Sequence, residues 1–164
     1  DKMTLRGILG ALSKIAKRLP VIFPAHPRTV KQISTFQLWK LVDYIDERID
    51  YNDTHTKVRV IPPLGYLDFL WLMKNATVVL TDSGGIQEET TILGVPCITI
   101  RENTERPITI RQGTNVLAGS NPKNIMKAAR EILKNGKSRK RIPKYWDGKA
   151  AKRIVAVLTR KLQC

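Results

Sequence analysis

Cysteine is scarce in this chain of 164 residues, which has only two cysteines, and aromatic residues make up only 6%. Two cysteines exclude a small fold held together by disulfides. Long apolar runs are also missing, and none approaches the ~20 residues that a membrane helix needs. Hydrophobic residues nevertheless reach 42%. That content excludes a disordered chain and favours one globular domain.

Acidic residues are almost absent from the C-terminal segment. The chain has 29 Lys and Arg and 14 Asp and Glu, and residues 121–164 hold 14 of the former and two of the latter. This segment therefore carries +12 of the net +15. Basic segments attract nucleic acid, anionic lipid or phosphorylated metabolites, although most are only solvated surface. We regard a nucleic-acid-binding module as an alternative that is less favoured, because Tyr145 and Trp146 are the only aromatic residues there.

The N-terminus has neither an initiator methionine nor the pattern of a signal peptide. The chain is therefore expected to be a fragment or a processed piece. It also opens on a helical pattern at 4–18, whereas an open α/β domain usually opens on a strand near the sheet centre. We expect such a first strand to be missing.

Short apolar runs alternate with helical patterns along the chain. Strands are predicted at 21–23, 58–61, 77–80, 96–100 and 114–117, and further helices at 28–36, 38–49, 67–73, 86–93, 122–134 and 149–162. Loops are expected at 52–54 and 101–111, a basic linker at 135–148, and most of the apolar helix 67–73 in the core. The alternation predicts an α/β fold with a Rossmann-like parallel sheet flanked by helices on both faces.

The strongest motif joins the end of a strand to the start of a helix over residues 80–89. Ser83, Gly84 and Gly85 form the turn. Backbone amides at a helix start have no intrahelical acceptor, and glycines let an anion come close, so this turn can hold a diphosphate. Glu89 lies one turn further on the same face and is placed to accept hydrogen bonds from ribose hydroxyls. The alternative is an ordinary serine cap followed by acids that face solvent.

Other residues at the same edge are weaker candidates. Arg106 could pair with a diphosphate, and Phe69 could face a base. His26 could contact a phosphate or could simply cap a helix. No group of His, Cys, Asp and Glu has the spacing of metal ligands, so neither a metal nor a cofactor is expected. Cys97 is interpreted as a buried thiol and Cys164 as a terminal one.

Six blocks of residues resemble, in order, those of the non-hydrolysing UDP-N-acetylglucosamine 2-epimerases. They cover residues 22–29, 63–69, 81–89, 101–107, 113–119 and 146–151. The combination of Asp-Ser-Gly-Gly-Ile-Gln-Glu-Glu with Thr-Glu-Arg-Pro is specific to this family. The resemblance implies two Rossmann-like domains in a glycosyltransferase-B arrangement. Residues 1–164 would be the C-terminal, UDP-binding domain, and helix 149–162 would pack back across the domain junction.

The same resemblance implies roles for individual residues. Ser83, Gly84 and Gly85 would hold the diphosphate, Glu89 the ribose, and Arg106 a phosphate, with Phe69 at the uracil. His26, together with Arg28, would contact a phosphate or a second, regulatory UDP-sugar. The catalytic acid and base residues would lie on an N-terminal portion that this chain lacks, so the chain alone would be inactive.

The family also implies a reaction and a setting. The enzyme would interconvert UDP-N-acetylglucosamine and UDP-N-acetylmannosamine by eliminating and re-adding UDP. It would work as a cytoplasmic homodimer in the synthesis of cell-surface polysaccharide, with UDP-N-acetylglucosamine and UDP as ligands and with no membrane or nucleic-acid partner. A UDP-sugar glycosyltransferase of the same fold remains an alternative, and it would lack the block at 104–107.

Overall fold

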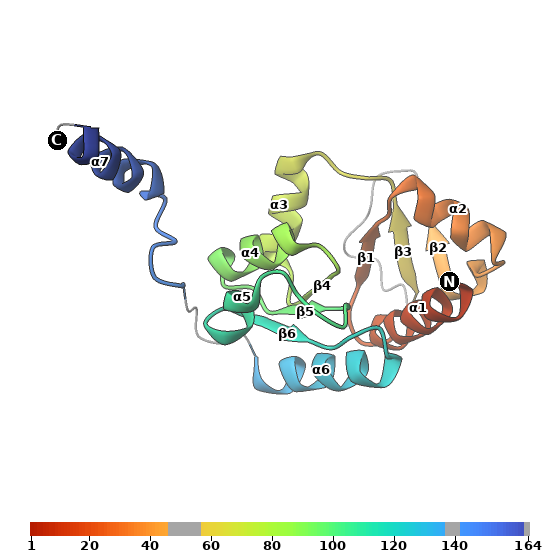
Figure 1. Ribbon diagram of the computed structural model, residues 1–164. Helices are drawn as coiled ribbons and strands as arrows, with labels where there is room; N and C mark the ends of the chain where they lie inside the picture. The colour runs from red at the N-terminus through yellow and green to blue at the C-terminus, as the bar shows by residue number, and fades with distance from the viewer. Residues whose placement is uncertain (46–56, 137–141, 163–164) are drawn as a thin grey trace.

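The computed structural model describes residues 1–45, 57–136 and 142–162, and its strands form two parallel sheets of three strands each (Figure 1). One sheet has the order β1-β3-β2, with β1 at Val21–Pro24, β2 at Val42–Tyr44 and β3 at Val58–Ile61. The other has the order β4-β5-β6, with β4 at Val79–Thr81, β5 at Cys97–Thr99 and β6 at Asn115–Leu117. The predicted α/β class with parallel strands and flanking helices is confirmed.

Helices cover both faces of the second sheet. In Figure 1, α6 (Pro122–Asn135) runs along one face of β5 and β6, and α4 (Gly84–Leu93) lies on the opposite face with α5 (Pro107–Arg111). The remaining helices are α1 (Lys2–Ala16), α2 (Pro27–Thr35), the short 3-10 helix η1 (Trp39–Leu41), α3 (Tyr66–Asn75) and α7 (Ala150–Leu162). The layers therefore follow from the alternation of short strands and amphipathic helices.

One hydrophobic core joins the two sheets. Leu9 of α1, Val58 of β3 and Ile98 of β5 are fully buried in it, as is Ile125 of α6. Helices α1 and α6 pack closely because Gly7 has no side chain: a Cβ there would lie 2.9 Å from Cγ of Pro122. This helix pair therefore supports both sheets from one side.

Two of the predicted elements are wrong. Residues 38–49 were expected to form a helix, but their described part forms η1 and then β2, in which Val42 pairs with Val58 of β3. The apolar residues there match a helical spacing, but pairing with a buried strand decides the conformation. The predicted loop 101–111 ends in α5, which begins with Pro107 at its first turn. The predicted loop at 52–54 and part of the linker 135–148 lie outside the described residues.

Helix α3 is also less buried than expected. Tyr66, Leu67 and Trp71 are 63%, 75% and 58% exposed, and Met73 is the buried residue of the helix. Helix α7 forms as predicted but none of its residues is buried, and it stands away from the body in Figure 1. Both helices therefore leave apolar side chains uncovered. No helix among the described residues has the length and hydropathy needed to cross a membrane.

Candidate nucleotide-binding site

The turn between β4 and α4 has backbone amides that are free to bind a ligand. Ser83 is the N-cap of α4, but its side chain makes no capping hydrogen bond. Instead, the backbone N–H of Ser83 donates to Oγ1 of Thr81 at 3.0 Å, which holds the turn in place. Gly85 is exposed, and Gly84 is half-buried. The first amides of the helix have no intrahelical acceptor and the Ser83 hydroxyl makes no capping bond, so these groups can donate hydrogen bonds to an anion.

Arg106 lies directly beside this turn, although 22 residues separate it from Gly84 in sequence. A Cβ built on Gly84 would lie 3.7 Å from Cγ of Arg106. Arg106 forms an ion pair with Glu88, in which Nε of Arg106 lies 2.9 Å from Oε1 of Glu88. The N–H of this Nε does not point at the carboxylate, so the contact is not a hydrogen bond. The structure thus brings a half-exposed guanidinium to the start of α4. A bound diphosphate would compete with Glu88 for it.

A buried polar network holds the segment that carries Arg106. Oε1 of Gln87 accepts hydrogen bonds from Oγ1 of Thr104 at 2.6 Å and from Nδ2 of Asn115 at 3.1 Å. Thr104 Oγ1 in turn accepts from the backbone N–H of Arg106 at 3.0 Å. These hydrogen bonds tie the three side chains together, although Nε2 of Gln87 has no hydrogen-bond partner among the described residues. Gln87 therefore positions Arg106 through Thr104.

The same network reaches the sheet through Asn115. Its Oδ1 accepts from Oγ1 of Thr99 at 2.8 Å, and its Nδ2 also donates to Oγ1 of Thr109 at 3.2 Å. Sequence reasoning missed Gln87 and Asn115 because their partners are far apart in the chain. The sequence offered one hint of this network, because Gln87 is a polar residue within the apolar pattern of the predicted helix 86–93.

Glu102 anchors the other end of the loop. Its Oε1 accepts hydrogen bonds from the backbone N–H and the hydroxyl of Ser120, both at 2.9 Å. These bonds lower the pKa of Glu102. Its carboxylate comes so close to Gly119, which has a φ of 69°, that a Cβ there would lie 2.8 Å from Oε2. The loop that presents Arg106 is therefore fixed at both ends.

Glu89 lies on α4 four residues after Gly85, about 6 Å further along the helix axis. It is half-buried, and its carboxylate makes no hydrogen bond or ion pair with any other described residue. Phe69 is half-buried in the first turn of α3, which packs against α4. The structure thus brings Arg106 to the turn at Ser83, Gly84 and Gly85, with Glu89 further along α4 and Phe69 on the neighbouring helix α3.

His26 and Arg28 are not part of this cluster. They follow β1, which belongs to the other sheet, and both are exposed. Nδ1 of His26 accepts the backbone N–H of Arg28 at 3.2 Å, so His26 is the N-cap of α2. The structure therefore gives His26 the capping role that was one of its two interpretations.

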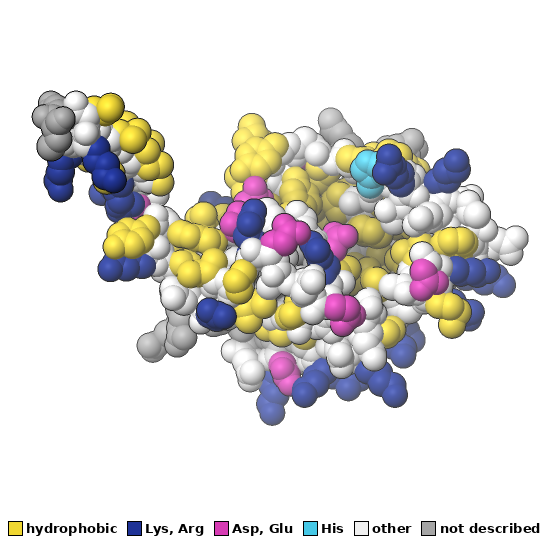
Figure 2. Space-filling view, in the orientation of Figure 1, with side chains coloured by type: hydrophobic (Ala, Val, Ile, Leu, Met, Phe, Trp, Pro, Cys, Tyr) yellow, Lys and Arg dark blue, Asp and Glu magenta, His cyan; other side chains and the backbone are white. Residues whose placement is uncertain are grey.

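The described residues contain no group of three or more His, Cys, Asp and Glu that could hold a metal ion. Cys97 is a buried free thiol, as expected, and burial raises its pKa to about 11. Cys164 lies outside the described residues. Charge around the site is mixed: acidic side chains gather over α4 and the neighbouring loops, whereas Lys and Arg line the edge formed by α6 (Figure 2).

Comparison with known proteins identifies a family. The family model described as UDP-N-acetylglucosamine 2-epimerase matches residues 1–159. A UDP-N-acetylglucosamine 2-epimerase from Methanocaldococcus jannaschii is 46% identical over 85% of this chain. A UDP-2,3-diacetamido-2,3-dideoxy-D-glucuronate 2-epimerase from Pseudomonas aeruginosa is 36% identical over 98% of the chain. The matches cover 35% and 41% of those two proteins, so the chain spans well under half of their length.

Solved structures give the same result. The crystal structure of the M. jannaschii UDP-GlcNAc 2-epimerase in complex with UDP-GlcNAc and UDP superposes with a TM-score of 0.76 at 40% identity. The match covers 98% of this chain and 41% of that one. The fold is accordingly the one expected from the resemblance, the Rossmann-like portion of a glycosyltransferase-B-type protein.

Proposed function

Because the chain belongs to the UDP-N-acetylglucosamine 2-epimerase family, we propose that it is the C-terminal, UDP-binding portion of an enzyme that inverts C2 of UDP-N-acetylglucosamine. The observation that carries the proposal is the turn at Ser83, Gly84 and Gly85, whose free amides adjoin Arg106. Amides at a helix start and a guanidinium are both suited to a diphosphate. Glu89 would bind the ribose hydroxyls, and Phe69 would lie at the uracil.

In the proposed reaction, the bond between C1 of the sugar and the diphosphate oxygen breaks while C2 loses its proton. UDP leaves with the bonding electrons, and a double bond forms between C1 and C2. UDP then adds back at C1 as a proton returns to the opposite face of C2. Negative charge grows on the diphosphate during elimination, and the amides of α4 with Arg106 would stabilise it. The acid and base residues would come from the portion outside this chain.

Two features support a second domain above the site. The apolar side chains of Tyr66, Leu67 and Trp71 are exposed on α3 next to α4, and α7 exposes a further apolar face. Large exposed apolar patches mark interaction surfaces. In this proposal the N-terminal domain covers α3, and α7 packs back across the junction.

The sheet edges support a strand before Asp1. Strands β1 and β4 each end a sheet, and both present apolar, half-buried residues beside the shared core. Natural edge strands seldom stay apolar and unprotected. A parallel strand joined to β1 through α1 in the usual right-handed crossover would protect this edge. We propose that such a strand belongs to the same domain as residues 1–164.

The proposed setting is a cytoplasmic homodimer that supplies the synthesis of cell-surface polysaccharide. A regulatory UDP-sugar or phosphate would bind separately, at His26 and Arg28, which follow β1 of the other sheet. A sugar carrying other substituents is an equal candidate substrate, because the P. aeruginosa relative is named for a different UDP-sugar.

The test is an assay of the complete protein with UDP-N-acetylglucosamine in D2O. An epimerase exchanges the hydrogen at C2 for deuterium and gives UDP-N-acetylmannosamine. Transfer of the sugar to an added acceptor without exchange at C2 would instead support the glycosyltransferase alternative.

A further inference from the structure

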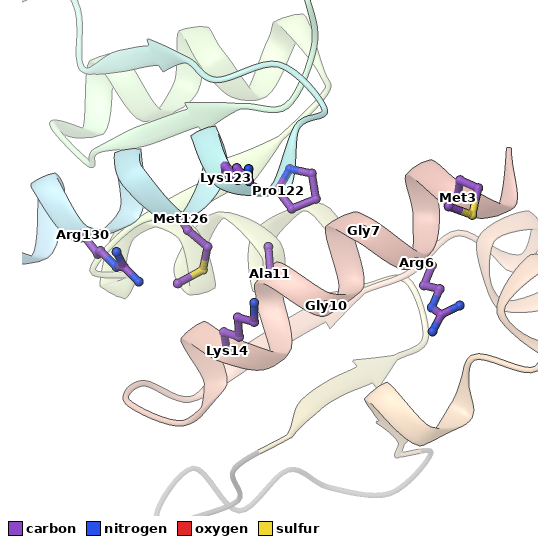
Figure 3. A pocket seen from close by; sticks show the side chains of 10 residues that line it. All are labelled: Met3, Arg6, Gly7, Gly10, Ala11, Lys14, Pro122, Lys123, Met126 and Arg130. Carbon is purple, nitrogen blue, oxygen red and sulfur yellow. The ribbon is translucent and has the colours of Figure 1, made fainter.

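A groove runs between α1 and α6, on the face of β5 opposite to α4 (Figures 1 and 3). It consists of two adjoining hollows of about 530 and 580 Å³. Lys14, Met126 and Arg130 line both of them, so the groove is continuous along the helix pair. It shares no residue with the turn at Ser83, and nothing in the proposed epimerase reaction uses it.

The floor of the groove is apolar. Gly10, Ala11 and Met126 form it where the two helices face each other (Figure 3). A Cβ on Gly10 would meet nothing within 4 Å, so the helix backbone is open there. Met3 at one end is 74% exposed, and methionine side chains adapt to the shape of a bound partner.

All the charged side chains that line the groove are cationic. Both walls contribute exposed basic side chains that form no ion pair with another described residue: Arg6, Lys14, Arg18, Lys123, Arg130 and Lys134. No acidic residue lines either hollow. Three cations on each wall therefore flank an apolar floor with nothing among the described residues to neutralise them.

We propose that this groove binds an acidic amphipathic helix of another protein. From Met3 to Ala16 the helical wall is about 20 Å long, the length of about three and a half helical turns. A helix with an apolar stripe and carboxylates on both sides of it would place its stripe on Gly10, Ala11 and Met126. Its carboxylates would then lie along the two rows of cations, which gives complementarity of shape and of charge.

Other occupants fit the groove less well. No aromatic side chain lines it, so bases of a nucleic acid would find no stacking surface. A second copy of the chain offers no matching helix, since among the described helices α4 has the most acidic residues, Glu88 and Glu89. The chemistry thus points to a different protein.

The test measures binding of a fluorescent helical peptide of about 18 residues to the complete protein at about 0.15 M salt. The peptide has leucine along one stripe and glutamate on both sides of it. We expect binding that weakens about tenfold or more in the double variant Lys14→Glu, Arg130→Glu. We expect a similar loss for Gly10→Leu, which keeps every charge but fills the floor. Unchanged affinity in both variants would overturn the proposal.

The matched control reverses two charges outside the groove, in the double variant Lys152→Glu, Lys161→Glu on α7. It should change the affinity for the peptide by less than about twofold. UDP binding and the circular dichroism spectrum verify that each variant folds. Equal binding of a scrambled peptide would mean that the groove attracts negative charge without recognising an amphipathic helix. Tighter binding of poly-uridine RNA, lost in the same groove variants, would assign the groove to nucleic acid. Protection of Lys14 and Lys123 from acetylation in the complete protein would mean that its own remainder fills the groove. Each of these three results would overturn the proposal.

Discussion

At the start of α4 the cation Arg106 is already paired with Glu88, whereas the six cations along the groove between α1 and α6 have no ion pair with another described residue. The loop that carries Arg106 is held by partly buried hydrogen bonds through Gln87 and Thr104. The groove cations are instead exposed and form no ion pair with another described residue. A fixed arrangement selects one ligand geometry, and a row of exposed charges selects only the sign of charge and a shape.

Removing the fixed cation should have the largest effect. In the complete protein, Arg106→Ala should lower turnover of UDP-N-acetylglucosamine about 100-fold, because the charge on the departing diphosphate loses its partner. Steady-state assay of sugar epimerisation measures this. Arg111→Ala removes an exposed arginine at the end of the same helix α5 and should leave the rate nearly unchanged. A wild-type rate for Arg106→Ala would exclude it from the site.

Breaking the network beneath Arg106 should cost stability as well as activity. Gln87→Leu leaves Thr104 and Asn115 without their buried acceptor, which should lower the free energy of unfolding by about 2 kcal/mol. It should also weaken UDP binding, because Arg106 loses its position. Chemical denaturation and calorimetry give the two values. The control is Thr35→Ala, which removes an exposed hydroxyl that is hydrogen-bonded within α2. It should change neither the free energy of unfolding nor the affinity for UDP.

Glu89 separates recognition of a nucleotide from recognition of a phosphate. Glu89→Ala should weaken UDP binding about tenfold, which is about 1.4 kcal/mol, and leave the affinity for inorganic pyrophosphate unchanged. Wild-type protein should likewise bind a deoxyribose analogue of UDP less tightly. Calorimetry with the three ligands provides the comparison. If Glu89→Ala lowers the affinity for UDP and for pyrophosphate equally, Glu89 does not bind the ribose.

The two glycines of α1 offer a smaller and purely structural contrast. Gly10→Ala should raise the free energy of unfolding by about 0.5–1 kcal/mol, since the new Cβ meets open space in a helix. Gly7→Ala should lower it by about 1 kcal/mol, because its Cβ would press on Pro122 at 2.9 Å. Thermal unfolding of both variants tests whether Gly10 faces an open groove. Destabilisation by Gly10→Ala would mean that it does not.

The sequence predicts the local features of this protein better than those that depend on distant partners. The turn at Ser83 is visible because its glycines sit between an apolar strand and a helical pattern. Strand β2 was missed because Val42 adopts its conformation only by pairing with Val58. The role of Gln87 depends on Asn115, 28 residues away, and no spacing rule predicts such a pair. The exposure of Trp71 was missed because an apolar helix predicts burial without telling what covers it.

The most direct test of the central claim is a crystal structure of the complete protein with UDP. Our account predicts diphosphate oxygens at about 3 Å from the backbone amides of Gly84 and Gly85, with Arg106 turned from Glu88 towards the phosphate. Uridine diphosphate bound elsewhere, with side chains packed over the start of α4, would contradict it.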